Sequence, residues 1–316
     1  MAIHKITPSS KDYLWGGTKL IEHYGKTTDQ DIMAESWEIS SHPDGPSYLE
    51  NGQTLIDYVS QDKERILGKN GLRFEDFPIL IKFIDAKDVL SIQVHPDDAY
   101  ALKHENQYGK EEMWYILEAE EGSSIYYGVN QDISKEDFAK AIEENEILDV
   151  LNRVEVKPGD VIYVEAGTIH AIGKGIVLCE IQQNSNVTYR VYDFNRKDKD
   201  GNTRDLHIEE SIEVSTLTKQ EVDFTAQGNL NEFDEYSRQV LVDSKYFVTE
   251  NFTVDGNVDF EVDESSFVAL ICLEGEIEVT SDSTTLNMTK GESIFVDANS
   301  GNVNVKGKGN FLHVSV

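Results

Sequence analysis

Apolar and polar residues alternate strictly over residues 90–95. The apolar positions are Leu90, Ile92 and Val94, and the polar positions are Ser91, Gln93 and His95. A period of two predicts a strand with one apolar face and one polar face. Polar side chains that point into a small β-structure cost free energy unless something binds them. The polar face of this strand is therefore a candidate binding site.

Short strands and helices alternate along the first 230 residues. Apolar runs and alternation predict strands over 35–40, 78–84, 89–95 and 113–117, and strand-rich chain over about 154–191. Helical spacing predicts short helices over 54–60, 63–67, 98–103 and 206–217. Ser134 and Asp137 resemble a capping box, which predicts a helical excursion through about Asn152.

The C-terminal part has a simpler pattern. From about Glu232 onward, short strands recur between Gly, Asp, Asn and Ser, which favours a β-sandwich or barrel. We place a domain boundary near residue 230, in the polar stretch 225–229. This division gives a catalytic domain over residues 1–230 and a second domain over residues 231–316.

An internal sequence repeat links the two parts. Residues 157–166 resemble residues 289–298, and the two stretches align without gaps from glycine to glycine. Each predicts a turn followed by a buried strand. On this alignment His170 falls opposite Asn302, so the second copy lacks that candidate metal ligand. The sequence thus predicts two copies of a β-barrel unit, of which only the first carries a metal.

The net charge of −31 argues against general nucleic-acid binding, which needs clustered Lys and Arg. A small anionic substrate stays possible, because a metal and a few local cations can reverse the field inside one pocket. No apolar run reaches membrane-spanning length, and the N-terminus lacks a signal-peptide core. We expect a cytoplasmic protein without a membrane partner, in which Cys179 and Cys272 are buried free thiols.

Four residues form a candidate metal site. Gln93 and His95 share a strand face, Glu112 begins another predicted strand, and His170 follows a turn at Gly167. Residues spread over three strands are expected to meet only in a closed sheet. Two imidazoles, a carboxylate and an amide oxygen suit zinc, and the same set suits non-haem iron. The alternative is that the histidines are core or surface residues with ordinary hydrogen bonds.

Charged residues near these ligands form a second candidate group. Residues 176–192 predict a hairpin with its turn at Ser185, which would place Glu180 opposite Arg190. This pair is either a structural salt bridge or, beside a metal, an acid/base group and an oxyanion clamp. Lys110 lies two residues before Glu112 and therefore on the same strand face. Its alternative role is that of a solvated lysine in a charged loop.

Several of these segments together resemble type I mannose-6-phosphate isomerase, in its short bacterial form. The segments are Ser91–Asp98, Gly109–Ile116, Ala166–Ala171, Thr188–Asp193, Trp15–Thr18 and Glu35–Glu38. The resemblance covers roughly residues 10–215, and the last eighty residues match only as a degenerate cupin-like barrel. It implies a mostly β fold with helical insertions and two cupin-type jelly-roll barrels. It also implies an aldose–ketose isomerase with one Zn²⁺ per chain, which interconverts mannose 6-phosphate and fructose 6-phosphate.

The resemblance also assigns residues by matching position. It places the zinc ligands at Gln93, His95, Glu112 and His170, the active-site arginine at Arg190, the pocket lysine at Lys110 and an acid at Glu180. The chain departs from the general cupin signature, because Gln93 stands where a first histidine is usual and Glu112 comes late. The large helical domain of long eukaryotic forms has no counterpart here.

The implied reaction moves a proton between C1 and C2 of an open-chain sugar through an enediol. Glu180 or a metal-bound water would move the proton, and Lys110 and Arg190 would face the oxyanion or the phosphate. The sequence singles out neither a base nor a phosphate site. Two rival functions remain at this stage: an iron-dependent cupin oxygenase and a non-catalytic cupin that binds a sugar phosphate.

Overall fold

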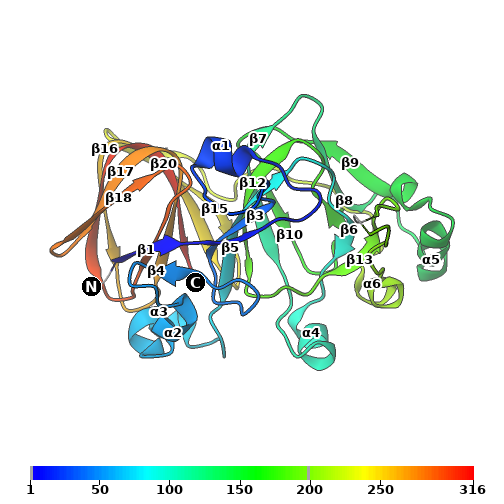
Figure 1. The fold of residues 1–316 in the computed structure, drawn as a ribbon, viewed down its shortest axis with the longest axis horizontal. Helices are drawn as coiled ribbons and strands as arrows, with labels where there is room; N and C mark the ends of the chain where they lie inside the picture. The colour runs from blue at the N-terminus through cyan, green and yellow to red at the C-terminus, as the bar shows by residue number, and fades with distance from the viewer. Residues whose placement is uncertain (1–2, 198–199) are drawn as a thin grey trace.

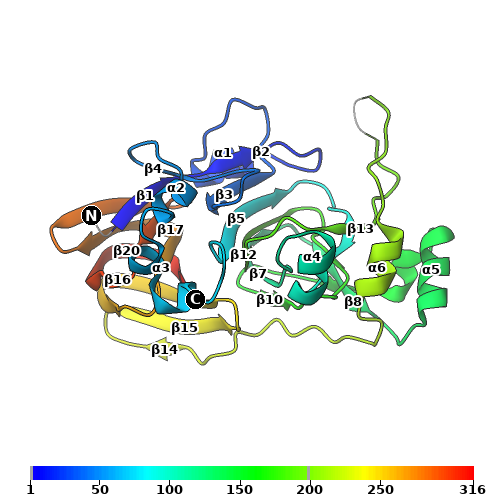
Figure 2. The ribbon, with the colours of Figure 1, turned by 90° about the horizontal axis from the view of Figure 1, so that it is seen from below.

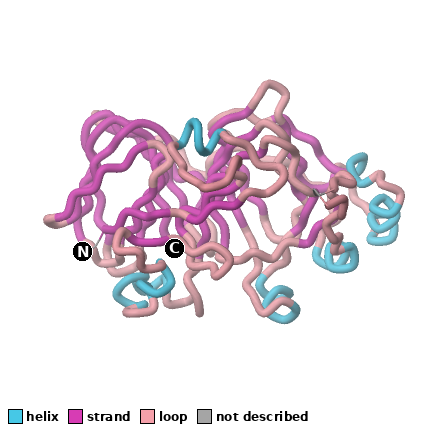
Figure 3. Tube along the Cα trace, in the orientation of Figure 1, coloured by secondary structure: helices cyan, strands magenta, loops and turns pink. Residues whose placement is uncertain are grey.

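Strands make up most of the protein and gather in two β lobes, with the helices around the outside (Figures 1 and 3). This computed structural model describes residues 3–197 and 200–316. The prediction of a mostly β chain with helical insertions is confirmed. Three hydrogen-bonded sheets contain the named strands, two in the first lobe and one in the second.

Two sheets that share one core form the first lobe. The six-stranded sheet contains, in spatial order, β10 (Val161–Val164), β7 (Glu112–Ala119), β12 (Ile176–Gln183), β5 (Ile79–Ala86), β3 (Glu35–Ile39) and β2 (Ser9–Lys11). The five-stranded sheet contains β13 (Tyr189–Tyr192), β6 (Ile92–Val94), β11 (His170–Ala171), β8 (Ser124–Val129) and β9 (Leu151–Glu155). Apolar side chains from both sheets, such as Ile116 and Ile125, belong to one buried cluster.

A single nine-stranded sheet forms the second lobe around its own apolar cluster. Its main path runs β14 (Asn231–Glu232), β15 (Tyr236–Asp243), β16 (Val248–Val262), β20 (Gly301–Ser315), β17 (Val268–Ser281), β19 (Ser293–Val296), β1 (Ile3–Thr7) and β4 (Tyr48–Leu49), with β18 (Thr284–Thr289) paired to β17. Two of these strands, β1 and β4, come from the first fifty residues. In the β1–β19 pair, Ile3 lies opposite Val296.

Neither lobe is a closed barrel in the described part of the chain, because no sheet pairs its first strand with its last. The expected pair of closed jelly-roll barrels is therefore not confirmed. The first lobe brings its strands together by facing two open sheets across a shared core instead. Such facing also buries the apolar sides of both sheets without a continuous ring of hydrogen bonds.

The internal repeat seen in the sequence is present in the structure. In each copy the backbone N–H of an acid donates to a carbonyl three residues earlier, Asp160 to Lys157 and Glu292 to Thr289. The carboxylate of each acid accepts a hydrogen bond from the N–H of that earlier residue, at 2.8 Å in both copies. The glycine before each acid has a positive φ, 91° in the first copy and 89° in the second. Strands β10 and β19 then follow equivalent turns.

The helices are short and lie at the periphery of the lobes (Figures 1 and 3). They are α1 (Lys19–Tyr24), α2 (Leu55–Val59), α3 (Lys63–Gly71), α4 (Asp98–His104), α5 (Lys135–Glu143), the 3₁₀ turn η1 (Ile147–Val150) and α6 (Ile208–Val214). The predicted cap of α5 is confirmed, because the Ser134 hydroxyl accepts a hydrogen bond from the Asp137 N–H at 3.0 Å. None of the described helices combines the length and apolar character needed to cross a membrane.

A third apolar cluster joins the two lobes. It contains Met113 from β7 together with Phe247 and Phe295 from the second lobe. Helix α3 is broken at Gly68, where the second lobe approaches so closely that a Cβ would lie 2.8 Å from the Ser265 backbone. After α6 the chain crosses to β14 through residues 215–230, which contain no named helix or strand (Figure 2). Both cysteines are buried free thiols, as predicted.

Candidate metal centre and the adjoining cavity

Three of the four predicted metal ligands meet between the two sheets of the first lobe. His95 directly follows β6, His170 begins β11, and these strands pair so that His170 lies opposite Gln93. Glu112 begins β7 in the facing sheet. The ligand atoms of His95, Glu112 and His170 all lie within 4.8 Å of one another. The prediction that these residues meet is confirmed, although they meet across two open sheets rather than in a closed one.

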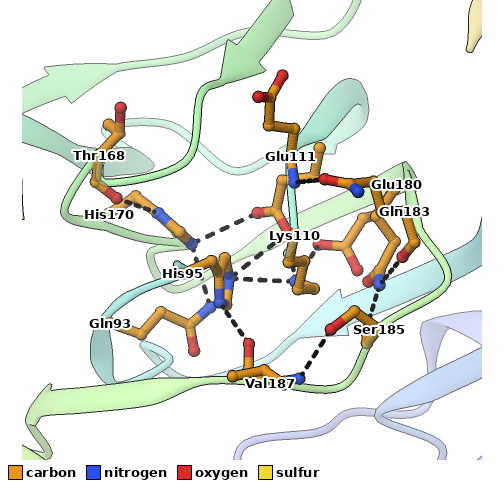
Figure 4. A network of polar contacts seen from close by, with 12 residues as sticks. Gln93, His95, Lys110, Glu111, Thr168, His170, Glu180, Gln183, Ser185 and Val187 are labelled. Atoms are coloured by element: carbon orange, nitrogen blue, oxygen red, sulfur yellow. Dashed lines mark hydrogen bonds and ion pairs between the residues drawn. The ribbon is translucent and has the colours of Figure 1, made fainter. Parts of the chain in front are cut away.

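Backbone carbonyls fix the orientation of both imidazoles (Figure 4). The Nδ1 of His95 lies 2.9 Å from the Val187 carbonyl, and the Nδ1 of His170 lies 2.8 Å from the Thr168 carbonyl. Because a carbonyl only accepts, each Nδ1 carries the proton, and each Nε2 keeps its lone pair. These lone pairs face Glu112, with Nε2–carboxylate distances of 3.6 Å for His95 and 3.4 Å for His170. This is the usual support given to metal-binding histidines.

Burial sets the charge of this centre, since His95, Glu112 and His170 are at most 1% exposed. Burial lowers the pKa of His170 to about 4 and that of His95 well below its usual value. Burial raises the pKa of Glu112 to about 7, in spite of the nearby Lys110. Neutral imidazoles beside a desolvated carboxylate form a donor set that suits a divalent ion. The residues present therefore fit a bound zinc or iron ion.

We expect zinc binding to displace about one proton per ion from Glu112 at about pH 6 and almost none from that residue at about pH 8. Glu112 is mostly protonated at the lower pH because its pKa is about 7, whereas both imidazoles are already neutral. Calorimetric titration of the metal-free protein in two buffers with different ionisation enthalpies measures the number of protons. Release of two or more protons at the lower pH would contradict this assignment, because it would require charged imidazoles.

Gln93 lies at the edge of the centre rather than inside it. Its amide Nε2 is 3.3 Å from the His170 Nε2, and its side chain is partly exposed. A half-turn of the amide would present its oxygen to the same position. Within residues 3–197 and 200–316, no second grouping of His, Cys, Asp or Glu has this geometry. Asn302, which the alignment of the internal repeat places opposite His170, instead donates a hydrogen bond to Asp259 at 3.0 Å.

Lys110 connects the centre to a group of buried charges. Its Nζ lies 3.1 Å from the His95 Nε2 and donates a short hydrogen bond to the Glu112 carboxylate (Figure 4). The second oxygen of Glu112 accepts a hydrogen bond from the Trp114 indole at 3.0 Å. The same indole N–H lies 3.2 Å from Glu180. Lys110 is 4% exposed, so it is not the solvated lysine of the alternative interpretation.

Glu180 is held by two lysines. Lys82 lies 3.0 Å from one of its oxygens, and Lys110 lies 4.0 Å from the other. Burial alone would raise the pKa of Glu180, but Lys110 and Lys82 outweigh burial and lower it to about 2. Glu180 is therefore ionised at neutral pH.

The predicted hairpin between Glu180 and Arg190 is wrong. Strand β12 pairs with β5 and β7, where Glu180 lies opposite Lys82 and Trp114. Strand β13 pairs with β6 in the other sheet, where Arg190 lies opposite Gln93. The chain between the strands passes from one sheet to the other instead of folding back in a tight turn.

Glu180 and Arg190 nevertheless face one cavity of about 270 Å³. Its charged lining residues are Lys82, Lys110, Arg190, Arg204, Glu35 and Glu180. Gln93 also lines it, so the metal centre lies directly behind one wall. Arg190 donates from Nη1 to the Asp205 carbonyl at 2.8 Å, and its buried Nε has no partner among the described residues. A cavity of this size and charge suits a small anionic ligand.

Sequence reasoning missed four residues of this cavity. A lone lysine inside the apolar run 78–84 was a usable signal for Lys82, because a buried lysine needs an acidic partner. Trp15 was part of a quoted segment, but nothing marked its indole as a cavity wall. Glu35 begins another segment of the family resemblance, but nothing marked its carboxylate as part of a cavity, and Arg204 lies in no such segment.

Family models match both ends of the chain. The model described as "Phosphomannose isomerase type I, catalytic domain" matches residues 3–131. The model described as "Mannose-6-phosphate isomerase, cupin domain" matches residues 237–316. The two matches fall on the first and second lobes, apart from the strands β1 and β4.

Whole-chain comparisons agree with these matches. The chain is 37% identical to the mannose-6-phosphate isomerase of Streptococcus mutans, over 90% of this chain and 88% of that protein. It is 34% identical to mannose-6-phosphate isomerase ManA of Bacillus subtilis, over 95% and 94% of the two chains. The crystal structure of a Bacillus subtilis mannose 6-phosphate isomerase superposes with a TM-score of 0.92 at 32% identity, and the match covers both chains completely.

Proposed function

The chain belongs to the type I mannose-6-phosphate isomerase family, and from this premise we propose that it interconverts D-mannose 6-phosphate and D-fructose 6-phosphate with one bound Zn²⁺. Membership makes the protein an isomerase. The sugar phosphates are the substrates that its relatives' names state. The zinc and the roles of individual residues are inferences from the site.

The charge of the cavity is the observation that carries the substrate proposal. Four cations and two carboxylates line it, in a protein with a net charge of −31. Lys82 and Lys110 are each 4% exposed, so solvent screens them weakly. A local excess of positive charge in an acidic protein favours an anionic ligand at this place. A hexose phosphate carries the negative charge that such a cavity would bind.

We propose zinc as the ion because the family resemblance implies it and the donor set suits it, with His95, Glu112 and His170 as ligands and Gln93 at the edge. When bound, the ion would act as a Lewis acid that stabilises negative charge on substrate oxygens. The two imidazoles offer Nε2 lone pairs, and Trp114 and Lys110 hold the carboxylate of Glu112. Preorganised ligands of this kind need little rearrangement on binding an ion.

Two side chains are placed to stabilise the enediol. A base that takes the proton from the carbon next to the carbonyl leaves negative charge on the former carbonyl oxygen, which is on C1 in the aldose and on C2 in the ketose. Lys110 and Arg190 both line the cavity, one from each sheet. Their N–H groups would donate hydrogen bonds to those oxygens as the charge develops, and one such donor is worth about 3–4 kcal/mol.

Glu180 is better suited to hold lysines than to accept the proton. A carboxylate whose pKa is about 2 is a weak base at neutral pH. Its contacts hold the side chains of Lys82 and Lys110 at the cavity wall. We therefore propose that Glu180 positions these two lysines. Arg204, whose side chain is 34% exposed, is the cation we place near the phosphate at the open side.

We also propose that both lobes are cupin-type jelly rolls and that the boundary between them lies near residue 230. The equivalent turns before β10 and β19 support a common unit. In this division, residues 1–230 form the catalytic domain, and its strands β1 and β4 belong to the sheet formed by residues 231–316. The two reduced cysteines are compatible with the cytoplasm as the place of action.

A coupled assay tests the function. Purified protein with one equivalent of zinc is expected to convert mannose 6-phosphate, with the fructose 6-phosphate measured through glucose 6-phosphate and its dehydrogenase. A chelator should remove the activity and zinc should restore it. Binding of mannose 6-phosphate without turnover would overturn the proposal. Iron in the purified protein together with oxygen uptake would support the rival oxygenase instead.

A further inference from the structure

We propose that Asp98, held by Tyr246 of the second lobe, is a positioning residue that fixes the segment carrying Lys110 and Glu112. The second lobe would thereby act on the metal centre of the first. This inference rests on the proposed metal site and concerns residues outside it. It gives the second lobe a role besides packing.

The carboxylate of Asp98 accepts three hydrogen bonds from three parts of the chain. One oxygen accepts from the Gly109 backbone N–H and from the Gln183 side-chain amide, each at 2.9 Å. The other oxygen accepts from the Tyr246 hydroxyl at 2.7 Å. Hydrogen bonds to a carboxylate are stronger than those between neutral groups. Asp98 thus ties the start of the ligand strand to β12 and to the second lobe.

The same network continues to the next residues of the segment. The Gln183 side-chain oxygen accepts a hydrogen bond from the Glu111 N–H at 2.9 Å (Figure 4). The Lys110 N–H donates to the Pro96 carbonyl at 3.1 Å. Lys110 and Glu112 are therefore flanked by fixed backbone groups. A shift of Asp98 or Gln183 would move the two side chains together.

Gly109 shows how closely this segment is fitted. A Cβ at this position would lie 2.5 Å from the Asp97 carbonyl carbon and 2.6 Å from the Asp98 nitrogen. Its φ is not positive, so the need for glycine comes from space rather than from backbone conformation. The segment before Glu112 lies directly against the chain that bears Asp98.

The second lobe presents Tyr246 from a fixed turn. Tyr246 is 4% exposed, and the next residue, Phe247, is fully buried in the cluster between the lobes. The Ser244 hydroxyl accepts hydrogen bonds from the N–H groups of both residues at 3.2 Å. The turn between β15 and β16 therefore holds the phenol in place against Asp98.

Capping of α4 does not explain Asp98. The N-cap of that helix is Asp97, whose side chain accepts a hydrogen bond from the Tyr100 N–H at 2.9 Å. The carboxylate of Asp98 points instead to Gly109, Gln183 and Tyr246. These contacts are those of a residue that holds the segment before Glu112 in position.

The test compares Tyr246→Phe, Asp98→Asn and Asp98→Ala with the matched control Tyr58→Phe. Tyr58 also donates from its hydroxyl to an aspartate at 2.7 Å, but that aspartate, Asp297, contacts Arg65 and His4 rather than the metal centre. We expect Asp98→Ala to weaken zinc binding and to lower kcat about tenfold, with smaller effects for Asp98→Asn and Tyr246→Phe. The change should fall on kcat more than on KM.

A further measurement does not depend on catalytic activity. Hydrogen exchange of the metal-free protein is expected to show faster exchange of the Gly109 and Glu111 amides in Asp98→Ala than in Tyr58→Phe. Equal zinc affinity, kcat and exchange in all four variants would overturn the positioning role. A wild-type protein that binds no divalent ion would instead overturn the proposed function, and the inference with it.

Discussion

Replacing His170 with alanine is expected to abolish zinc binding and isomerase activity while the protein stays folded. The His170 Nε2 carries one of the two imidazole lone pairs that face Glu112, and the cluster of described residues contains no third histidine to replace it. We expect the zinc affinity to fall at least about a hundredfold, because loss of a ligand exceeds the 10–100-fold effect of its supporting residues. Zinc titration and the coupled assay measure both losses.

Folding should survive this substitution. The imidazole contributes one hydrogen bond to the Thr168 carbonyl and an edge contact with Trp114, so its loss should cost about 1–3 kcal/mol. His313→Ala is the matched control: burial also lowers the pKa of that histidine to about 4, and it lies 3.5 Å from Glu250. The control should retain zinc and activity. Full activity in His170→Ala would remove His170 from the site.

Replacing Arg190 with alanine is expected to leave zinc binding intact and to lower kcat about 10²–10³-fold. Arg190 lines the cavity, and its hydrogen bonds go to His207 and to the Asp205 carbonyl rather than to the metal ligands. Its guanidinium would donate to the oxygens that become charged as the enediol forms. Zinc content together with steady-state kinetics distinguishes stabilisation of the enediol from a role in holding the metal ion.

Arg190→Lys provides the comparison for charge. It keeps the positive charge but loses the planar fork of donors, so only part of kcat should return. Loss of zinc with an unchanged rate in Arg190→Ala would show that its role is misassigned. Equal activity of the lysine and alanine variants would mean that charge at this position does not contribute.

Local patterns in the sequence predicted most of the local structure. The helix predicted over 98–103 is α4, and the strand predicted over 113–117 is β7. The capping signal at Ser134 and the glycine turns before β10 and β19 were also informative. These features depend on residues close together in the chain, so a single sequence contains the necessary information.

Pairing between distant segments was harder to predict. The polar stretch around Ser185 joins two strand-like segments, and it looks the same whether the chain folds back in a hairpin or crosses from one sheet to another. The sequence likewise contains no sign that β1 and β4 join the second lobe, because that pairing spans most of the chain. Closed sheets were expected from the need to bring ligands together, and two facing sheets meet that need equally well.

The metal centre was predictable because its polar residues stand out on apolar strands. His95 lies on the polar face of an alternating strand, His170 stands between Ile169 and Ala171, and Glu112 begins a buried strand. The cavity was less visible, because Glu35 and Arg204 reach it from segments without such a signal. Proximity in space, which the fold alone provides, makes these residues part of one site.

The most direct test of the metal centre is anomalous diffraction from crystals of the zinc-loaded protein, recorded on both sides of the zinc edge. The account predicts one peak per chain, about 2.0–2.2 Å from the Nε2 atoms of His95 and His170 and from the Glu112 carboxylate. A peak elsewhere, or none in protein shown to be active, would contradict it.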